Sequence, residues 1–533
     1  MLSKVLVLVA YFALVLALGF AAKSRLRDNP SQYFLAGRGL STFLLVGTMA
    51  ATNFSAFTVF GASGAGYRDG LAFYPIMAFG TGFMALSFLF LGLKVWKMGR
   101  DHDLITPAEL VQKVYGQRGL SVLFALVMVV FTVPYLALQP LAGGKVIGQL
   151  FGVPPWVGAV LVTAVILAYT MRGGLRAVAW TDVLQGFLML VLLVVALALV
   201  AVHSGGWEAG FDRILASEPA LLSRPGERGV YTPAVWFSYL LLWFFCDPMF
   251  PQLFQRFYSA SSPRALARTA LVYPLICTVV FAPPIAMGVL GRLVFPGLQG
   301  AEADNIVPLL MTQLAGDLMG TLVLTAGLAA LMSTMDSQLL TLGSIFSRDL
   351  YPLLGRKKGA TGVVSRVFVA VLALAGLAVA LVSDATILDL GITAFTGLAV
   401  LFPTVFFGLY LHKPSPAAAM ASIVVGEAFA LAYHLRLLPT LGFLPAVPVI
   451  AASLSAYVFV QMAWRRLGVA KPGGRHLAAL ATFAAIFVAA HDFWRWGEVG
   501  GLYLGWPLWA WHFVGLSVVQ FAATWWWLRR SQA

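Results

Sequence analysis

The sequence predicts an all-α protein that crosses a lipid bilayer many times. Of its 533 residues, 60% are hydrophobic and 11% are charged, whereas about 25% of the residues of a soluble domain are charged. Apolar runs long enough to cross a bilayer recur from Leu6 to Trp527, with no hydrophilic interval of domain size between them. Backbone groups in lipid must be paired within the structure, so runs of this length are expected to be helices rather than barrel strands.

About fifteen apolar segments follow one another along the chain. The N-terminal run is longer than the apolar region of a signal peptide, and no cleavage site followed by a soluble domain appears, so we expect it to be a true span. The approximate limits of the segments are residues 4–22, 41–66, 71–96, 119–143, 154–171, 178–203, 232–257, 268–294, 318–347, 365–383, 386–412, 414–435, 440–463, 476–495 and 506–528.

The basic residues predict how the chain is oriented in the membrane. Most of the 35 Lys and Arg residues fall in alternate loops, and loops rich in these residues face the cytoplasm. The N-terminus is then outside and the C-terminus inside, in agreement with an odd number of segments. The net charge of +14 is spread over these short loops, so we expect no nucleic-acid partner.

Cysteine usage and loop length exclude further classes of protein. Cys246 and Cys277 both lie inside apolar runs, so neither a disulfide scaffold nor a CxxC metal site can be built. The longest external segment, residues 204–230, is too short for a catalytic domain. We therefore expect that the protein is not an enzyme and that it acts within the membrane.

Two of the apolar segments are interrupted. The second contains the polar run Thr52-Asn53-Phe54-Ser55, and the seventh contains Asp247-Pro248 followed by Pro251. In transporters built from repeated five-helix units, the first helix of each unit is unwound near the midplane of the membrane. The interruptions are five segments apart, which predicts an inverted repeat. The alternative is that Gly and Pro are simply common in membrane helices.

Three motifs resemble those of the sodium:solute symporter family. They are Tyr33-Phe34-Leu35-Ala36-Gly37-Arg38, the run from Gly173 to Val178 with Trp180 to Gln185, and Leu328-Ala329-Ala330-Leu331-Met332-Ser333-Thr334-Met335-Asp336-Ser337. The resemblance covers about residues 4–463. It implies a LeuT-like 5+5 inverted repeat with one preceding helix, and it implies an external N-terminus.

The segments and the resemblance together divide the chain into six parts. They are an extra N-terminal span with a cytoplasmic loop (1–40), the first repeat half (41–203), an external loop (204–231), the second repeat half (232–412), accessory spans (413–463) and a two-helix extension of unknown role (464–533).

A sodium site is expected at the first interruption. Carbonyls freed at a helix break, with hydroxyls from a facing helix, supply the oxygen ligands that such an ion prefers. The resemblance implies the carbonyls of Ala51, Phe54 and Ala330 and the hydroxyls of Ser333 and Thr334. The alternative is that these hydroxyls bond carbonyls of their own helix.

Acidic residues within apolar segments suggest further roles, because charges there are costly. By resemblance, Asp182, Asp336 and Ser337, with Ser333, form a second sodium site; the alternative is that the two aspartates are structural acids, so one sodium is the simpler stoichiometry. Asp247 either neutralises the second interruption or lines the substrate route. For Glu427 we expect a local polar pairing.

Substrate contacts are expected from the interrupted segments and the segments that face them. No Lys or Arg is expected deep in a core span, which favours a small neutral solute or a monocarboxylate. The pattern Pro-Tyr-x-x-x-Gln resembles the monocarboxylate and pantothenate branches of the family. The residues that the resemblance implies are Asn53, Ser55, Thr58, Tyr135, Gln139, Trp243, Phe244, Thr393 and Thr396.

The resemblance implies a secondary active transporter in a cell membrane, the plasma (inner) membrane of a bacterium. It would couple inward Na⁺ movement to uptake of a small organic solute by alternating access, with Na⁺ as coupling ion and no obligate protein partner. The runner-up is coupling to H⁺ through Asp182 and Asp336. From other classes, a membrane-embedded sensor or a channel remains an alternative.

Overall fold

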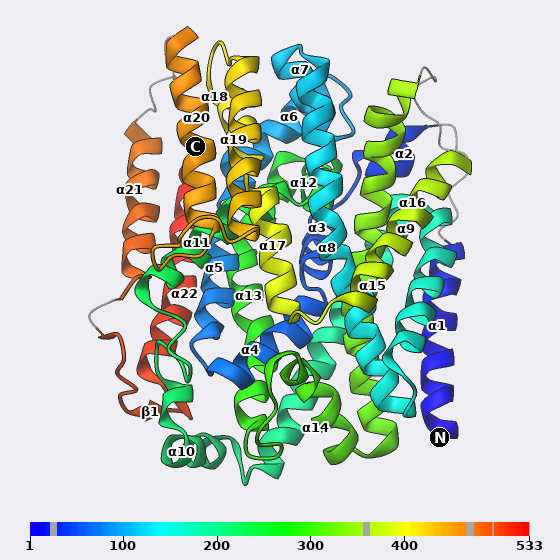
Figure 1. Ribbon diagram of the computed structural model, residues 1–533, viewed down its shortest axis with the longest axis vertical. Coiled ribbons are helices and arrows are strands. Elements are labelled where there is room, and N and C mark those ends of the chain that lie inside the picture. Colours follow the sequence, from blue (N-terminus) through cyan, green and yellow to red (C-terminus); the bar gives the residue numbers. More distant parts are fainter. Residues whose placement is uncertain (22–28, 355–362, 465–473, 493–494, 532–533) are drawn as a thin grey trace.

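The computed structural model describes residues 1–21, 29–354, 363–464, 474–492 and 495–531, and these are mostly helical. The sheet within these ranges is one antiparallel hairpin of two strands, β1 (Leu502–Tyr503) and β2 (Trp506–Pro507). The long helices run roughly along the vertical axis of Figure 1, with α1 (Leu2–Ala21) at one flank and α21 (Gly474–Ala489) at the other. The predicted all-α architecture is confirmed.

The helices of the N-terminal part follow the predicted apolar segments. After α1 they are α2 (Pro30–Leu35), η1 (Ala36–Arg38), α3 (Thr42–Asn53), η2 (Phe57–Gly61), α4 (Ala62–Asp69), α5 (Phe73–Met84), η3 (Phe88–Gly92), α6 (Leu93–Asp101), α7 (Pro107–Tyr115), α8 (Arg118–Phe151), α9 (Pro155–His203), α10 (Trp207–Ser217) and η4 (Pro219–Leu222).

The C-terminal part continues in the same way. Its helices are α11 (Pro233–Cys246), η5 (Asp247–Met249), α12 (Pro251–Ser259), α13 (Pro263–Gly291), η6 (Gly300–Asn305), α14 (Ile306–Leu314), α15 (Gly316–Ile345), η7 (Phe346–Leu350), η8 (Tyr351–Leu354), α16 (Val363–Val382), α17 (Ile387–Ala399), α18 (Phe402–Tyr410), α19 (Pro416–His434), α20 (Ala446–Trp464), α21 and α22 (Leu508–Ser531).

Nine helices in the described ranges are long and apolar enough to cross a membrane, or eleven if each of two bent pairs is one span. Shorter apolar helices cover Leu2–Leu18, Pro155–Ala168 and Leu477–Ala489. The total of about fifteen spans and the external N-terminus stay predictions. Several basic residues on which the orientation rests, among them Lys23, Arg356 and Arg465, lie outside the described residues.

The two interruptions expected from the sequence are confirmed as helix breaks. The axis bends by 58° between Thr42–Asn53 and Phe57–Asp69, and by 56° between Pro233–Met249 and Pro251–Ser259. At the first break Phe54 leaves the helical conformation, with φ −87° and ψ 91°. At the second, Pro248 and Pro251 lack the backbone N–H that a continuous helix requires.

The Gly173-Gly174 motif has a backbone role. Gly174 has φ +63° and ψ −177° and divides α9 into two helical segments. A Cβ atom on Gly174 would lie 2.7 Å from the carbonyl oxygen of Tyr33, so both the backbone angle and the close approach of α2 require glycine. This division explains why the sequence showed two apolar segments, 154–171 and 178–203, within one helical element.

Helix α15 lies at the centre of the bundle. It packs against α8, α9 and α3, and α1 covers the junction of α9 with α15. Every residue of α15 from Val323 to Ile345 is buried. Polar side chains on α15 therefore face other helices rather than lipid, which brings them to the first break.

The C-terminal extension folds back onto the core. Helix α22 packs against α5 and α13, and Gln520 Nε2 donates to the Gly82 carbonyl at 2.9 Å. Within the extension, Asp492 forms an ion pair of 3.0 Å with Arg224 of the core, and the two side chains are 3% and 0% exposed. The Arg224 guanidinium also lies over the rings of Trp496 and Trp509, at 4.9 and 5.1 Å from their centroids. The segment around Asp492 is therefore held to the core by an ion pair and by cation–π contacts with Arg224.

We predict that Asp492→Asn lowers the melting temperature of the purified full chain. The substitution leaves a buried guanidinium without its counter-charge, a loss of about 3–5 kcal/mol. The matched control is Asp317→Asn, which removes an exposed partner of Lys4 and should leave the melting temperature almost unchanged. Equal melting temperatures for the two variants would contradict a stabilising role for the Arg224–Asp492 pair.

Candidate functional site

Hydroxyl groups of α15 meet the carbonyls freed at the first break. Ser333 Oγ lies 2.8 Å from the carbonyl oxygen of Ala51 and 3.0 Å from that of Ala330. Thr334 Oγ1 lies 3.0 Å from the carbonyl oxygen of Thr52 and 3.3 Å from that of Ala330. The structure thus brings together four of the five residues predicted for the first sodium site, which are Ala51, Ala330, Ser333 and Thr334.

This group of atoms has the chemistry of an alkali-cation site. It offers three carbonyl oxygens and two hydroxyl oxygens, all from buried residues. Hydroxyl groups that donate to these carbonyls can turn their lone pairs toward a cation, and oxygen is the ligand that hard cations prefer. The residues present therefore fit Na⁺, without a charged ligand in direct contact.

Two details differ from the predicted ligand set. The second carbonyl of α3 in contact with α15 is that of Thr52, which the sequence analysis did not name as an ion ligand. Phe54, the fifth predicted residue, follows α3 at the break, and its ring packs against Tyr273 and Phe281 at centroid distances of 6.1 and 5.6 Å. The role of the Phe54 carbonyl stays a prediction.

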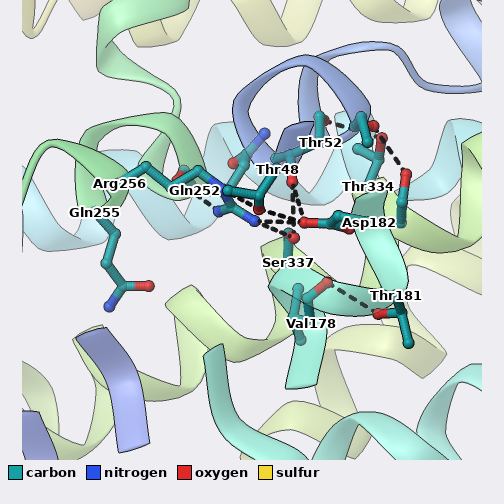
Figure 2. A network of polar contacts seen from close by, with 12 residues as sticks. Thr48, Thr52, Val178, Thr181, Asp182, Gln252, Gln255, Arg256, Thr334 and Ser337 are labelled. Carbon is teal, nitrogen blue, oxygen red and sulfur yellow. Dashed lines mark hydrogen bonds and ion pairs between the residues drawn. The ribbon is translucent and has the colours of Figure 1, made fainter. Parts of the chain in front are cut away.

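A buried ion pair lies directly beside this site. Asp182 Oδ2 accepts hydrogen bonds from Thr48 Oγ1 and, at 3.1 Å, from Thr52 Oγ1. It also lies 3.0 Å from Arg256 Nη2, and both side chains of this pair are 0% exposed. Figure 2 shows Arg256 reaching from α12 across α3 to Asp182 on α9.

The guanidinium of Arg256 connects several helices. Its Nη2 donates to Ser337 Oγ on α15 at 2.7 Å, and its Nε donates to Thr48 Oγ1 on α3 at 2.9 Å (Figure 2). The expectation that no Lys or Arg lies deep in a core span was wrong. Arg256 lies at the end of the apolar segment 232–257, and α12 carries it into the bundle, where Asp182 compensates its charge.

The residues of the predicted second sodium site lie close to one another. Ser337 Oγ is 2.9 Å from Thr52 Oγ1, and Asp336 is fully buried beside it on α15. The Oδ1 atom of Asp182 has no hydrogen-bond partner among the described residues. The charge of Asp182, however, is already met by Arg256, which favours a structural role for this aspartate.

A small cavity of about 20 Å³, room for about one water molecule, lies between the two breaks. Five of the predicted substrate residues line it, from α3, the first break, α8 and α11. They are Asn53, Ser55, Thr58, Tyr135 and Trp243. Asp247 also lines it, as one of its two predicted roles required. The remaining lining residues, which the sequence analysis did not assign to the substrate site, are Phe57, Met77, Thr81, Phe250, Phe281 and Phe395.

Four predicted substrate residues lie outside this lining. Gln139 Oε1 accepts from the N–H of Ala56 at 3.2 Å, and its Nε2 donates to the carbonyl of Tyr135, so its amide holds the first break. Phe244 packs on Phe83 and Phe90. The hydroxyls of Thr393 and Thr396 bond carbonyls of their own helix, four residues earlier.

Some of the cavity residues that the sequence analysis did not assign to the substrate site could have been found from their positions in the sequence. Phe57 and Phe250 each follow a break by a few residues. Phe395, on α17, neighbours the predicted Thr396, and an error of one residue on a helix rotates the side chain by about 100°. Met77, Thr81 and Phe281 lie in apolar segments where nothing distinguishes them from packing residues.

A helical bundle of this kind, with two broken spans around a cavity and freed carbonyls facing hydroxyls, is the architecture of secondary transporters. Residues 33–426 match the model of the sodium:solute symporter family, and the chain belongs to this family.

Curated relatives and a solved structure agree with this membership. The chain is 28% identical over 472 residues to the sodium/pantothenate symporter of Escherichia coli (strain K12), covering 86% of this chain and 96% of the relative. It is 26% identical over 433 residues to a sodium/proline symporter of Staphylococcus aureus (strain bovine RF122 / ET3-1), covering 79% and 84%. Its fold is similar to that of a Na⁺-coupled sialic acid symporter in a substrate-bound outward-open state, with a TM-score of 0.73, 18% identity, and coverage of 88% and 99%.

We predict that Asp182 and Arg256 are energetically coupled. Asp182→Asn and Arg256→Gln should each lower the melting temperature, because each leaves the other charge buried and unpaired. The double variant should lose less stability than the sum of the two single losses, by about 0.5–3 kcal/mol.

The control combines Asp182→Asn with Thr325→Ala, a hydroxyl of α15 that bonds its own helix. These two losses should add. If the stability losses of Asp182→Asn and Arg256→Gln also add in the double variant, the two residues do not stabilise each other and the ion pair is contradicted.

Proposed function

We propose that the protein couples inward Na⁺ movement to uptake of a small organic solute by alternating access. The observation that carries the proposal is the contact of Ser333 and Thr334 on α15 with the carbonyls freed at the end of α3. Family membership supports Na⁺ as the coupling ion, and relatives named for pantothenate and proline support a small organic solute.

The connection between ion and solute runs through a few residues of α3. Ala51 and Thr52 supply carbonyls to the proposed ion site, and Asn53 and Ser55 line the cavity. A cation that holds the end of α3 against α15 therefore also fixes the wall of the cavity. Since each ligand favours the conformation in which its own contacts are complete, the two bind cooperatively.

We propose a stoichiometry of one Na⁺ per solute. The pairing of Asp182 with Arg256 supports it, because the aspartate does not require a second cation for charge compensation. The alternatives are a second Na⁺ at Asp182, Asp336 and Ser337, or coupling to H⁺. A Hill coefficient near two for Na⁺, or uptake driven by a proton gradient without Na⁺, would favour one of these alternatives.

We further propose that residues 41–203 and 232–412 form an inverted repeat, with the N-terminus outside a bacterial plasma membrane. The similar bends of 58° and 56° at the starts of the two halves support the repeat. The relatives named above are bacterial, which supports the membrane. In this arrangement the solute and the ion lie between the breaks, and the bundle rocks about them.

The function is tested with purified protein in liposomes. Labelled small amines, amino acids, acids and sugars are offered under an inward Na⁺ gradient, an equal K⁺ gradient or a proton gradient. Accumulation above the external concentration only with Na⁺ would support the symporter. Equilibration without accumulation would indicate a channel, and binding without any transport would indicate a sensor.

We predict that Ser333→Ala and Thr334→Ala weaken Na⁺ binding. Each removes one oxygen ligand while the helix remains, so the Na⁺ concentration for half-maximal thermal stabilisation should rise about tenfold or more. KCl at equal ionic strength controls for salt effects. Thr325→Ala is the matched control, since its hydroxyl bonds the Thr321 carbonyl on the same helix. An unchanged Na⁺ response in both variants would reject the site.

We predict that a cysteine at Thr58 reports on access to the cavity. In a background in which Cys246 and Cys277, both buried, are replaced, Thr58→Cys should react with an impermeant thiol reagent added from outside. Na⁺ alone should preserve or raise the reaction rate, and Na⁺ with a transported solute should lower it. Equal rates under all three conditions would contradict the alternating-access proposal.

A further inference from the structure

The cavity between the breaks contains one carboxylate, that of Asp247. Asp247 begins the short turn η5 directly after α11, and 3% of its surface is exposed. Its Oδ1 accepts a weak hydrogen bond from Cys246 Sγ at 3.3 Å, and the side chain of Asn53 is a second neutral hydrogen-bond partner of the carboxylate. The break at Pro248 and Pro251 ends the helix here, so the side chain lines the cavity instead of packing between helices.

Asp247 has no basic partner. No Lys, Arg or His nitrogen of the described residues lies within 4.0 Å of its carboxylate, and Arg256, the other buried charge near this break, is paired with Asp182. The carboxylates of the described ion pairs are those of Asp69, Asp103, Glu109, Asp182, Glu218, Asp304, Asp317 and Asp492. Burying a charge without a counter-charge is costly, so a cationic ligand is the complement that this cavity lacks.

Aromatic rings form the rest of the wall. Phe395 lies at their centre, with the centroid of Tyr135 at 4.9 Å and that of Phe250 at 5.0 Å. Phe57 and Trp243 are each at 5.6 Å from Phe395. Ring faces attract cations, and a group of aromatic rings is the usual receptor for quaternary ammonium ions. The same wall repels water, which strengthens the attraction of Asp247 for a positive charge.

Two polar atoms of the cavity specify more about the ligand. Trp243 Nε1 and Thr81 Oγ1 are buried and have no hydrogen-bond partner among the described residues. An indole N–H only donates, so it requires an acceptor. A ligand that carries both an acceptor oxygen and a charged nitrogen would satisfy the indole and the carboxylate together.

We propose that this cavity, when the rocking of the bundle widens it, binds a small organic cation, an amine or quaternary ammonium ion that carries a hydroxyl or carbonyl oxygen. Asp247 pairs with the cationic centre, the rings around Phe395 enclose it, and Trp243 donates to the oxygen. The proposal rests on the proposed function, since it assigns the solute class of that transporter. It departs from the neutral or monocarboxylate solute expected from the sequence, because an anion would face the Asp247 carboxylate at close range.

The test compares cations with neutral molecules of the same shape. Choline is paired with 3,3-dimethylbutan-1-ol, in which carbon replaces the charged nitrogen, and 3,3-dimethylbutanoate supplies an anion. A graded series of hydroxylated amines, each with its carbon isostere, completes the panel. Binding to the purified full chain is measured by thermal shift and by calorimetry, in NaCl and in KCl. We expect at least one cation to bind at least about tenfold more tightly than its isostere, and the anion not to bind.

Substitutions at Asp247 test whether its carboxylate is responsible for the binding of the cation. Asp247→Asn should weaken binding of the preferred cation at least about tenfold, and Asp247→Glu should retain part of the affinity. Glu427→Gln, which removes a carboxylate of α19 outside the cavity, is the matched control and should leave cation binding unchanged. If Asp247→Asn does not fold, the comparison of each cation with its neutral isostere on the wild-type protein still tests the proposal.

Three results would overturn the proposal. They are a panel in which no cation binds more tightly than its isostere, equal cation binding by wild-type protein and Asp247→Asn, and proton uptake on binding of a neutral solute, which would assign the carboxylate to a proton. Failure of the proposed function is distinguishable, because it appears as a wild-type protein that NaCl does not stabilise over KCl.

Discussion

A helix interrupted inside a membrane must find partners for the backbone groups that it frees, because lipid offers none. In this protein the end of α3 meets that requirement with side chains from distant parts of the chain. The hydroxyls of Ser333 and Thr334 meet its carbonyls, and the amide of Gln139 receives the N–H of Ala56. Helices α8 and α15 are therefore placed by the break, and the ion site and the cavity wall are consequences of the same requirement.

Near the two breaks, the ion pair of Asp182 with Arg256 differs from the carboxylate of Asp247 in how its charge is compensated. Asp182 and Arg256 join α9 and α12 and, through Thr48 and Ser337, also α3 and α15. Such a pair fixes the relative positions of helices without presenting a net charge to a ligand. Asp247 has no such partner in the part of the chain that the structure describes, so the electrostatic character of the cavity is set by this one carboxylate and the rings around it.

Local features of the sequence predicted the helices and both breaks, because each depends on residues near one another in the chain. The grouping of Ala51 with Ser333, 282 residues apart, was instead an implication of the family resemblance. Polar residues and prolines within an apolar run identify a break directly. The pairing of Arg256 with Asp182 could not be predicted in this way, since it depends on how two helices separated by 74 residues pack. The substrate wall was predicted only in part for the same reason. The direction of Phe395 or Thr396 follows from the rotation of α17, which apolar composition alone does not determine.

The C-terminal extension illustrates a difference between membrane proteins and soluble ones. Lipid tails are as apolar as leucine, so the face of α5 under α22 requires no cover to keep it from water. What holds α22 there is specific contact, such as the bond from Gln520 to Gly82 and the Arg224–Asp492 pair near the hairpin. Over evolutionary time, a chain that gained or lost these two helices would exchange protein neighbours for lipid along one flank, while the interior around the two breaks would keep its composition.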